Sequence, residues 1–416
     1  MCVIKYSKLV NFEGREDSVD KFYMKLPADV SFIIDRMNSH GYSAHVVGGS
    51  VRDSLIGREL GDFDITTSAT PSETKTVFSD CKTVDTGIKH GTVTLVLGGV
   101  PYEITTYRVD GDYKDNRHPD QVTFTDRIEE DLARRDFTVN AMAYDPHIGL
   151  IDPFFGTEDA RARIIRAVGD PYVRFDEDAL RILRALRFAS VLGFEIETTT
   201  DRAARELSDR LGSISKERVY TELKKLIMGK NAVKILTSYS DVLSLVLDGL
   251  KITSLPSAEC FDTADYYSRL AAVFLLNSDD PVSKADDTLS LLKTDKFTRT
   301  HVTSVLKAYY SASFDDRTSV LTALALNGEE AVRGALDLGA LVGRYGVCER
   351  DLFTDTLRCG IPYKISGLAV RGGDLLSLGI SGERVGETLK ELLFTVIEGR
   401  VENTTEDIIR YLKRGE

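Results

Sequence analysis

Hydrophobic and polar residues follow two different spacings in the first part of the chain. After Pro27, apolar residues recur at helical spacing, which predicts an amphipathic helix that ends near Gly41. Pro71 opens a further predicted helix. Predicted strands, recognised as short apolar runs rich in β-branched and aromatic residues, lie at 44–47, 92–97 and 102–107. We therefore expect a small mixed sheet with helices.

Helical spacing dominates the rest of the chain. Residues 129–144 and 175–190 each carry apolar residues at intervals that predict one helix, and from about 231 the pattern stays helical. The expected fold class is α+β, with a mixed-sheet head followed by all-α parts. The predicted parts are a lead-in at 1–26, a head at 27–153, a neck at 154–230, a body at 231–360 and a tail at 361–416.

Length and composition narrow the class of protein. A chain of 416 residues exceeds what one core usually supports, so several domains are expected. The sequence has no apolar run near 18 residues, which argues against a membrane span, and the N-terminus is too short in apolar residues for a signal peptide. Five cysteines without paired spacing favour reduced thiols in the cytoplasm over disulfides or zinc.

Charge is distributed unevenly along the chain. The net charge is −12, which is unusual for a protein that binds nucleic acid. Residues 155–230 are the exception, with 15 lysines and arginines against 13 acidic residues. Any RNA contact is therefore expected to centre on this segment and to show a moderate salt dependence.

The segment after the first predicted strand has the features of an anion site. Gly48 and Gly49 permit a sharp turn with exposed N–H groups, and a short helix is predicted from Ser50 to Ile56 with Arg52 in its first turn. A helix N-terminus and a guanidinium would then face one phosphate. The alternative is a plain Gly-Gly-Ser turn that binds nothing.

Two aspartates follow ten and twelve residues after Arg52. In a predicted strand, Asp62 and Asp64 lie on one face because side chains alternate, and their carboxylates suit a hard divalent cation. Such like charges repel unless a cation or a titration shift offsets them. The alternative is a solvated strand edge.

Together these stretches resemble a known family. Gly-Gly-Ser-Val-Arg-Asp followed by Gly-Asp-Phe-Asp-Ile-Thr-Thr-Ser-Ala is similar to the signature of class II template-independent nucleotidyltransferases, which include CCA-adding tRNA nucleotidyltransferases and bacterial poly(A) polymerases. The resemblance implies a polymerase β-like head with helical neck, body and tail. It also implies Mg²⁺ held by Asp62 and Asp64, and a triphosphate held by Gly49, Arg52 and downstream arginines. It is specific over residues 30–230 and looser beyond.

A second motif lies at 134–142. Arg-Arg-Asp-Phe-Thr-Val-Asn-Ala-Met resembles the family's second motif, which implies that Arg135 touches the nucleotide and Asn140 shapes the pocket. The alternative interpretation is that Arg134 and Arg135 form an ordinary surface ion pair with Asp136. Asp152-Pro153 and Gly156 resemble the third motif, which implies a hinge.

Acidic and basic residues repeat at spacing three in the segment 175–190. Asp178, Arg181, Arg184 and Arg187 form a drifting stripe on the predicted helix, which suits phosphate oxygens and base edges, although one such pair is usually a solvated face. Glu-Asp-Ala-Leu-Arg resembles the family's amino-acid template. This implies that Asp178 accepts from the amino group of C or A and that Arg181 donates to a ring nitrogen, so that U and G are rejected.

Two later features affect the choice of activity. The polar loop 108–123 is either a plain surface loop or, by the resemblance, the flexible loop that accompanies addition of the terminal A. Where some relatives carry a His-Asp phosphohydrolase motif, this chain has Leu275-Leu276-Asn277, so that activity is rejected. The tail resembles the part of CCA-adding enzymes that grips tRNA.

The predicted function is therefore the addition of C, C and A to the tRNA 3′ end from CTP and ATP, without a nucleic-acid template, by nucleotidyl transfer with two Mg²⁺ ions. The alternatives are a poly(A) polymerase or an enzyme that adds only A, and, from another class, an RNA-binding protein with a dead site. Poly(A) polymerase is disfavoured because the C-terminus is acidic. The intact aspartates and arginine stripe disfavour a dead site. The partners expected are tRNA, ATP and CTP and no membrane, with monomer and homodimer both open.

Overall fold

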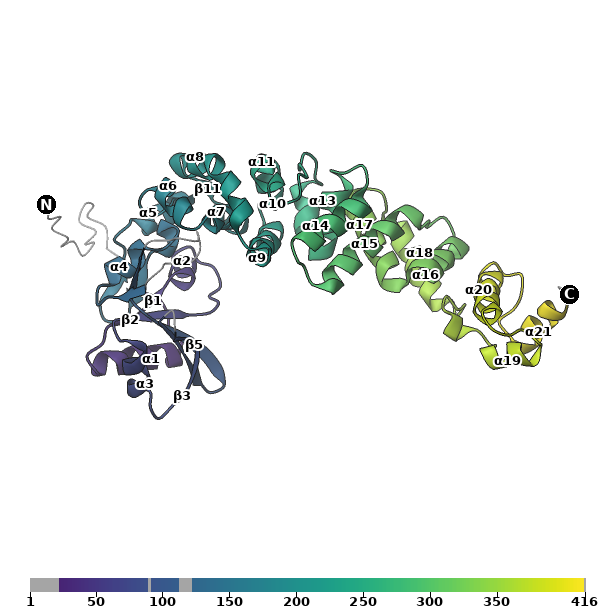
Figure 1. Ribbon diagram of the computed structural model, residues 1–416, viewed down its shortest axis with the longest axis horizontal. Helices are drawn as coiled ribbons and strands as arrows, with labels where there is room; N and C mark the ends of the chain where they lie inside the picture. The colour runs from purple at the N-terminus through teal and green to yellow at the C-terminus, as the bar shows by residue number, and fades with distance from the viewer. Residues whose placement is uncertain (1–21, 89–90, 112–121, 415–416) are drawn as a thin grey trace. The chain divides into compact units, whose positions relative to one another are not determined.

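A computed structural model describes residues 22–88, 91–111 and 122–414 (Figure 1). The chain divides into two compact units, Met1–Asn231 (unit 1) and Ala232–Glu416 (unit 2). Each is described by itself. None of the described helices is both long and apolar enough to cross a membrane.

Unit 1 begins with a head built on a mixed sheet, as the sequence predicts. Its strands run in the order β3-β4-β5-β2-β1-β8-β9, in which β2 and β5 are parallel and the other neighbours antiparallel. The bounds are β1 (Ala44–Val47), β2 (Asp64–Thr67), β3 (Lys82–Gly87), β4 (Thr92–Leu97), β5 (Val100–Thr106), β8 (Ala143–Asp145) and β9 (Gly149–Ile151). A separate hairpin joins β6 (Arg108–Asp110) and β7 (Val122–Phe124).

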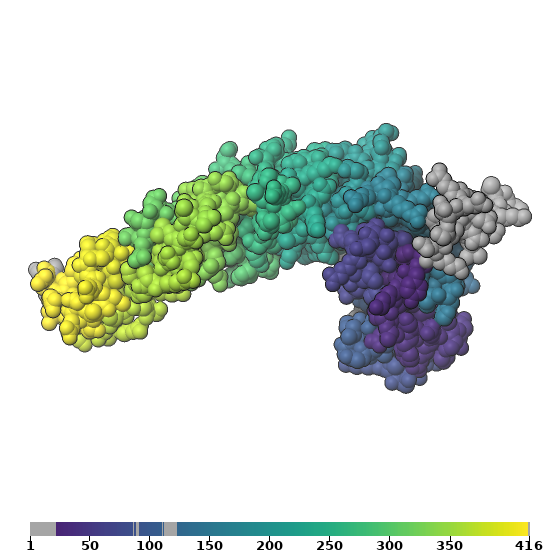
Figure 2. Space-filling view, turned by 180° about the vertical axis from the view of Figure 1, so that it is seen from behind, coloured from purple at the N-terminus to yellow at the C-terminus, as the bar shows by residue number. Residues whose placement is uncertain are grey.

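Helices cover this sheet and close its core. They are α1 (Ala28–Ser39), α2 (Gly49–Leu55), α3 (Pro71–Val77) and α4 (Ile128–Ala133), with a 3-10 turn η2 (Thr138–Asn140). In α1, the apolar residues Val30, Ile33, Ile34 and Met37 are fully buried against the sheet, which confirms the predicted amphipathic helix. Met24, which falls in the predicted lead-in, lies in the same core. Figure 2 shows the purple and blue atoms of the head gathered in one lobe.

The neck completes unit 1 with packed helices. Its elements are α5 (Gly156–Ala162), β10 (Ile164–Ile165), α6 (Pro171–Glu177), α7 (Leu180–Leu192), β11 (Glu195–Ile196), α8 (Thr198–Glu206), η3 (Ser208–Ser213) and α9 (Lys216–Ile227). The short strands β10 and β11 are parallel partners, and α7 packs along α9. A side chain at Gly229 would collide with Ser190, so glycine lets the end of α9 approach α7 closely.

Two predicted helices in unit 1 are wrong. Residues 129–144 are not one helix, because α4 ends at Ala133 and Tyr144 pairs with Val46 as part of β8. Residues 175–190 are also divided, because Asp178 is extended (φ −146°, ψ 100°) and its carboxylate accepts the N–H of Leu180. Asp178 therefore lies between α6 and α7 and not on a continuous helical face.

Unit 2 is helical throughout its regular elements. They are α10 (Ala232–Ser238), α11 (Ser240–Ser244), α12 (Ala258–Thr263), α13 (Tyr266–Leu275), α14 (Pro281–Leu291), α15 (Lys296–Ser311), α16 (Arg317–Asn327), α17 (Glu329–Leu341), α18 (Val347–Arg358), η4 (Ile365–Gly367), α19 (Gly372–Ser377), α20 (Arg384–Ile397) and α21 (Thr405–Arg414). One core gathers residues from 312 to 353, and another joins Leu321 to residues from 368 to 408. The α+β fold class is thus confirmed.

Candidate active site

The site begins where two neighbouring strands of the head meet. The register of β1 and β2 places Val47 opposite Asp64, so the turn after β1 lies beside the start of β2. Gly48 has a φ of +75°, which favours glycine, and its N–H donates to the carbonyl of Met142 at 3.2 Å. The sheet therefore holds the predicted Gly48–Gly49 turn next to the predicted aspartates.

Two guanidinium groups approach this turn. A Cβ added at Gly48 would lie 3.2 Å from Nη1 of Arg135, and one added at Gly49 would lie 3.5 Å from Nη2 of Arg52. The lack of side chains on the turn thus leaves room for both arginines. Nε of Arg135 is buried and has no hydrogen-bond partner among the described residues. Backbone N–H groups and two cations therefore share one small region, which suits an anion.

Asp62 and Asp64 are both exposed, while Phe63 between them packs against the head core. Regular strand begins only at Asp64, so the strand predicted to include Asp62 is wrong there, although the charge of Asp62 still lies close enough to act on Asp64. Desolvation raises the pKa of Asp64, Arg135 opposes this, and the nearby charge of Asp62 adds to the rise. Two mutually repelling, accessible carboxylates fit a divalent cation completed by substrate oxygens, which is how Mg²⁺ is commonly held. Among the described residues, no cluster of three or more His, Cys, Asp or Glu side chains is placed so that it could hold a metal ion by itself.

A buried carboxylate beneath the turn orients Arg135. Asp131 is fully buried on α4, and one of its oxygens accepts from Nη2 of Arg135 at 3.2 Å. Its other oxygen accepts from Nε and Nη2 of Arg134, at 3.0 and 2.8 Å. Burial opposes the charge, but the two arginines prevail and lower the pKa of Asp131. Asp131 is therefore an anion that fixes two cations beside the turn.

A second buried chain of contacts runs from the head into the neck. Arg52 donates to the side-chain oxygen of Asn140 at 2.5 Å, and the Asn140 amide donates to Asp136 at 3.1 Å. Asp136 in turn accepts from Nε of Arg184, at 2.7 Å. Burial opposes the charge of Asp136, but Arg184 and Asn140 bring its pKa down to about 2. The network ties α2, η2 and α7 together. Arg52 also forms a forked pair with Asp53.

Arg52 of α2 and two arginines of α7 gather around one aromatic ring. The guanidinium carbons of Arg52, Arg184 and Arg187 lie 5.4, 5.5 and 4.0 Å from the ring centre of Phe188. Glu222 on α9 is buried, and its carboxylate lies 3.0 Å from Nε of Arg187. Burial lowers the pKa of Arg187, the charge of Glu222 opposes this, and the neighbouring Arg184 adds to the fall. The ring therefore lies among three guanidinium groups, each of which is also paired with a carboxylate.

Asp178 and Arg181 do not pair with each other. Asp178 accepts from Nη2 of Arg218 on α9 at 2.7 Å, whereas Arg181 donates to Glu177 at 2.5 Å. Arg181 also donates to the backbone carbonyls of Arg174 and Arg134, both at 3.0 Å. Three of its five N–H groups are thus engaged. Both residues are near α7, but each is held by a different partner.

Sequence reasoning found the arginines but missed what holds them. Asp131, Glu222 and Phe188 were not predicted, because an acidic residue or a phenylalanine inside a helical pattern reads equally well as surface or core. Asp136 was read only as a surface ion partner, and it is buried instead. The loop predicted to assist A addition lies mostly at 112–121, outside the described residues.

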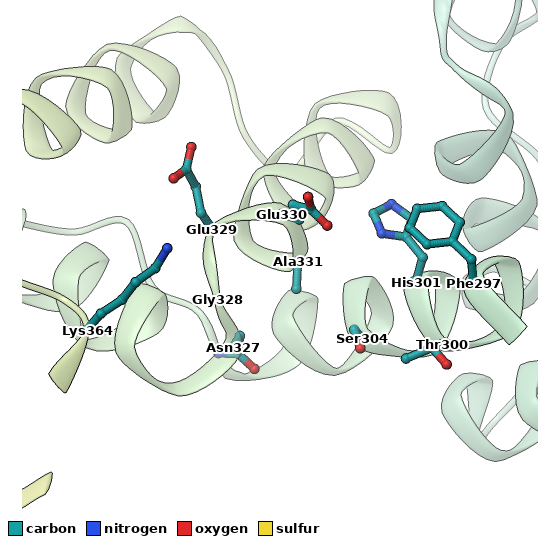
Figure 3. A pocket seen from close by; sticks show the side chains of 10 residues that line it. All are labelled: Phe297, Thr300, His301, Ser304, Asn327, Gly328, Glu329, Glu330, Ala331 and Lys364. Carbon is teal, nitrogen blue, oxygen red and sulfur yellow. The ribbon is translucent and has the colours of Figure 1, made fainter. Parts of the chain in front are cut away.

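A different cavity, of about 600 Å³, lies in unit 2 (Figure 3). It is lined by Phe297, Thr300, His301, Ser304, Asn327, Gly328, Glu329, Glu330, Ala331 and Lys364. The rings of Phe297 and His301 stack with centres 5.4 Å apart. Its lining mixes two carboxylates with one ammonium and contains no arginine, unlike the site in the head and neck.

Known proteins resemble both units. The family model described as "Poly A polymerase head domain" matches residues 44–166, and the one described as "Probable RNA and SrmB- binding site of polymerase A" matches 193–240. The CCA-adding enzyme of Geobacillus thermodenitrificans is 50% identical over 219 residues, or 52% of this chain and 54% of that protein.

Similarity also extends over nearly the whole chain. The CCA-adding enzyme of Lactobacillus helveticus is 37% identical over 390 residues, which cover 92% of this chain and 95% of that protein. The crystal structure of the Bacillus stearothermophilus CCA-adding enzyme in complex with CTP has a TM-score of 0.78 and 32% identity, covering 94% of this chain and 98% of the other. This chain therefore belongs to the CCA-adding enzymes, a family of nucleotidyltransferases.

Proposed function

We propose that this protein adds C, C and A to the 3′ end of tRNA from CTP and ATP without a nucleic-acid template. The observation that carries the proposal is the gathering of Arg52 and Arg135 at the Gly48–Gly49 turn, beside the Asp62–Asp64 pair. Near-full-length similarity to proteins named CCA-adding enzymes supports the choice of reaction. In nucleotidyl transfer, the 3′ hydroxyl attacks the α-phosphate and pyrophosphate leaves.

Asp62 and Asp64 are the residues proposed to bind Mg²⁺. When bound there, Mg²⁺ would help deprotonate the tRNA hydroxyl and offset charge on the departing pyrophosphate. The accessible position of both carboxylates supports this role, since substrate oxygens have to complete the coordination.

The triphosphate is proposed to lie against the turn and the arginine cluster. The N–H of Gly49 and the side chains of Arg52 and Arg135 would bind its oxygens, with Arg184 and Arg187 adding positive charge. Burial is the main cause of the lowered pKa of Arg187, and a bound anion would stabilise its charge as Glu222 does. The carboxylates beneath orient these arginines but leave Nε of Arg135 free to donate.

The base is proposed to be read by Asp178 and Arg181. A carboxylate accepts a hydrogen bond from the amino group of C or A, whereas it repels the carbonyl oxygen that U or G carries at the same position. This difference is a strong basis for selecting CTP and ATP over UTP and GTP. No base-paired template is then needed. The partly buried position of Asp178 between α6 and α7 supports this role, because burial strengthens the penalty for an unpaired polar group.

The tRNA is proposed to contact the arginine-rich neck and the tail, in the cytoplasm, with monomer and homodimer both open. Purified protein with labelled CTP and ATP, and a tRNA ending at the discriminator base, tests the activity. Sequential C, C and A addition supports the proposal. Addition of A alone to a tRNA ending in CC indicates an A-adding enzyme, long A tails on any RNA indicate a poly(A) polymerase, and RNA binding without incorporation indicates a dead site.

A further inference from the structure

We propose that the cavity of unit 2 is a second nucleotide site, which binds a nucleoside monophosphate. Its lining comes from α15, from the junction of α16 and α17, and from Lys364 just before η4. None of these residues belongs to the proposed nucleotidyl-transfer site, which lies in unit 1. The role of the cavity is therefore independent of the proposed function.

The chemistry of the cavity changes from one end to the other (Figure 3). Phe297 and His301 form an aromatic end, Lys364 forms a cationic end, and Glu330 lies between them. A nucleotide has the same order of groups, with a flat base, a sugar rich in hydroxyls and a charged phosphate. The volume of about 600 Å³ lies within the usual range for sites that bind small molecules.

The aromatic end offers a surface on which a base can stack. The rings of Phe297 and His301 lie within 10° of parallel, and Tyr267 packs at a steep angle against both, with ring centres 5.8 and 4.8 Å away. Tyr267 thus helps to fix the pair. In spite of these contacts, 57% of Phe297 stays exposed. Stacking of a base would remove this apolar surface from water, and such stacking contributes substantially to nucleotide affinity.

The polar side chains in the middle of the cavity are available to a ligand. Glu330 forms no ion pair among the described residues. The side-chain hydroxyls of Thr300 and Ser304, one turn apart on α15, have no hydrogen-bond partner in the described part of the chain. An acidic side chain is a common partner of a ribose hydroxyl in nucleotide sites. Glu330 is therefore the residue proposed to bind the sugar.

The cationic end suits one phosphate better than three. The ammonium of Lys364 lies 5.4 Å from the ring centre of Tyr363 and pairs with no carboxylate that the structure describes. Gly328 has no side chain to cap the first N–H groups of α17, which would add to the attraction. Glu329 opposes an anion, but its carboxylate already accepts from Arg333 at 2.7 Å and from Tyr363 at 2.9 Å. A single free ammonium therefore favours a ligand of low charge.

The test is photolabelling of the full chain with 2-azido-AMP, followed by mapping of the labelled peptides. We expect label on peptides that contain residues 297–304 or 327–331, and the AMP concentration that halves this labelling gives the affinity of the cavity. Phe297→Ala should weaken this affinity about tenfold, a typical loss for one stacked base. Lys364→Gln should weaken it by up to about fivefold, and Lys364→Arg should retain it.

Two competitors test the middle and the cationic end of the cavity. AMP should compete better than 2′-deoxy-AMP, and this difference should disappear in Glu330→Ala, because the carboxylate that binds the sugar hydroxyl is gone. AMP should also compete better than ATP, since Lys364 alone cannot offset the charge of a triphosphate.

The matched controls come from the same helix. Tyr310→Ala removes an aromatic residue of α15 that is also 57% exposed but lies outside the cavity. Lys307→Gln removes an exposed lysine of α15 that does not line it. Both variants should keep wild-type affinity for AMP. Thermal unfolding of each variant shows that the protein is folded.

A nucleotide can reach the cavity free or as part of bound tRNA, and a further arm distinguishes these sources. If the ligand is free, saturating tRNA leaves the labelling of these peptides unchanged. If tRNA supplies it, tRNA prevents the labelling, and Phe297→Ala lowers the affinity for tRNA. Absence of label from these peptides overturns the inference, and so does equal competition by AMP in the wild type and in folded Phe297→Ala. Neither result affects the incorporation of C and A, which tests the proposed function separately.

Discussion

The two units bury different kinds of side chain. In unit 1, the buried charged residues are Arg52, Asp131, Asp136, Asp145, Asp159, Arg181 and Glu222, whereas in the described part of unit 2 Arg269 alone falls in this class. Burying a charge is costly unless it is paired. The helices of unit 2 are instead held by apolar cores. Buried, paired charges therefore concentrate in the unit that contains the proposed anion site.

The largest expected effect comes from the aspartates that face solvent in unit 1. Asp62→Ala or Asp64→Ala should reduce incorporation of both C and A to background, because both proposed metal ligands are needed. Binding to tRNA should stay near normal, since it depends on separate basic contacts. Incorporation assays and gel-shift titrations measure the two properties.

The matched control is Asp85→Ala, an exposed aspartate of the head that pairs with Lys75. It should retain full activity, because a surface ion pair contributes little. Turnover retained in either Asp62→Ala or Asp64→Ala would contradict the metal assignment.

The next effect tests the buried network directly. Asp136→Asn removes the charge that holds Arg184, which should lower the free energy of unfolding by about 3–5 kcal/mol and weaken triphosphate binding as well. Arg269→Met in unit 2 is the comparison. Arg269 donates to the carbonyls of Asp262 and Ala264, so its loss should affect stability but leave activity unchanged. Denaturant unfolding and KM for CTP separate the two variants.

Asp136 also predicts how stability depends on pH. Its pKa is about 2 in the folded protein and about 3.9 when unfolded, so the unfolded chain takes up a proton first as the pH falls. The contribution of Asp136 to the free energy of unfolding is therefore complete above about pH 4 and is lost progressively down to about pH 2. The free energies of unfolding of the wild type and of Asp136→Asn, measured by denaturant titration at each pH, should converge over that range. If their difference stays constant instead, Asp136 is not the group responsible.

The sequence predicts those features of unit 1 that depend on neighbouring residues, and it fails where contacts far along the chain decide the structure. The turn at Gly48–Gly49 and the strand that begins at Asp64 follow from local rules on turns and strands. The helix predicted over 129–144 failed because contacts far along the chain prevail there: Thr138 donates to the carbonyl of Arg166, and Tyr144 pairs with Val46. At Asp178 the carboxylate bonds to a backbone N–H and breaks the helix. Partners such as Glu222 cannot be assigned from spacing because they come from other helices.

The residues proposed to read the base should give a smaller effect than the buried network. Asp178→Ala or Arg181→Ala should weaken discrimination by about 1–3 kcal/mol, the usual cost of leaving a buried polar group unpaired. UTP or GTP misincorporation should rise relative to CTP and ATP while the metal-dependent chemistry persists. An equal fall for all four nucleotides would place these residues in a supporting role only.

The smallest effect is expected at Phe188, where unit 1 brings three like charges around one ring. The negative face of the ring attracts each guanidinium by about 0.5–1 kcal/mol, and more where water is excluded. Arg187 is closest, with 4.0 Å between its guanidinium carbon and the ring centre. Phe188→Leu keeps most of the apolar volume but removes the attraction. We expect KM for both nucleotides to rise by about three- to fivefold, with selectivity between CTP and UTP unchanged because Asp178 is untouched. Phe188→Tyr retains an aromatic face and should restore the wild-type KM. A change in selectivity would mean that the ring positions the residues proposed to read the base as well as the arginines proposed to bind phosphate.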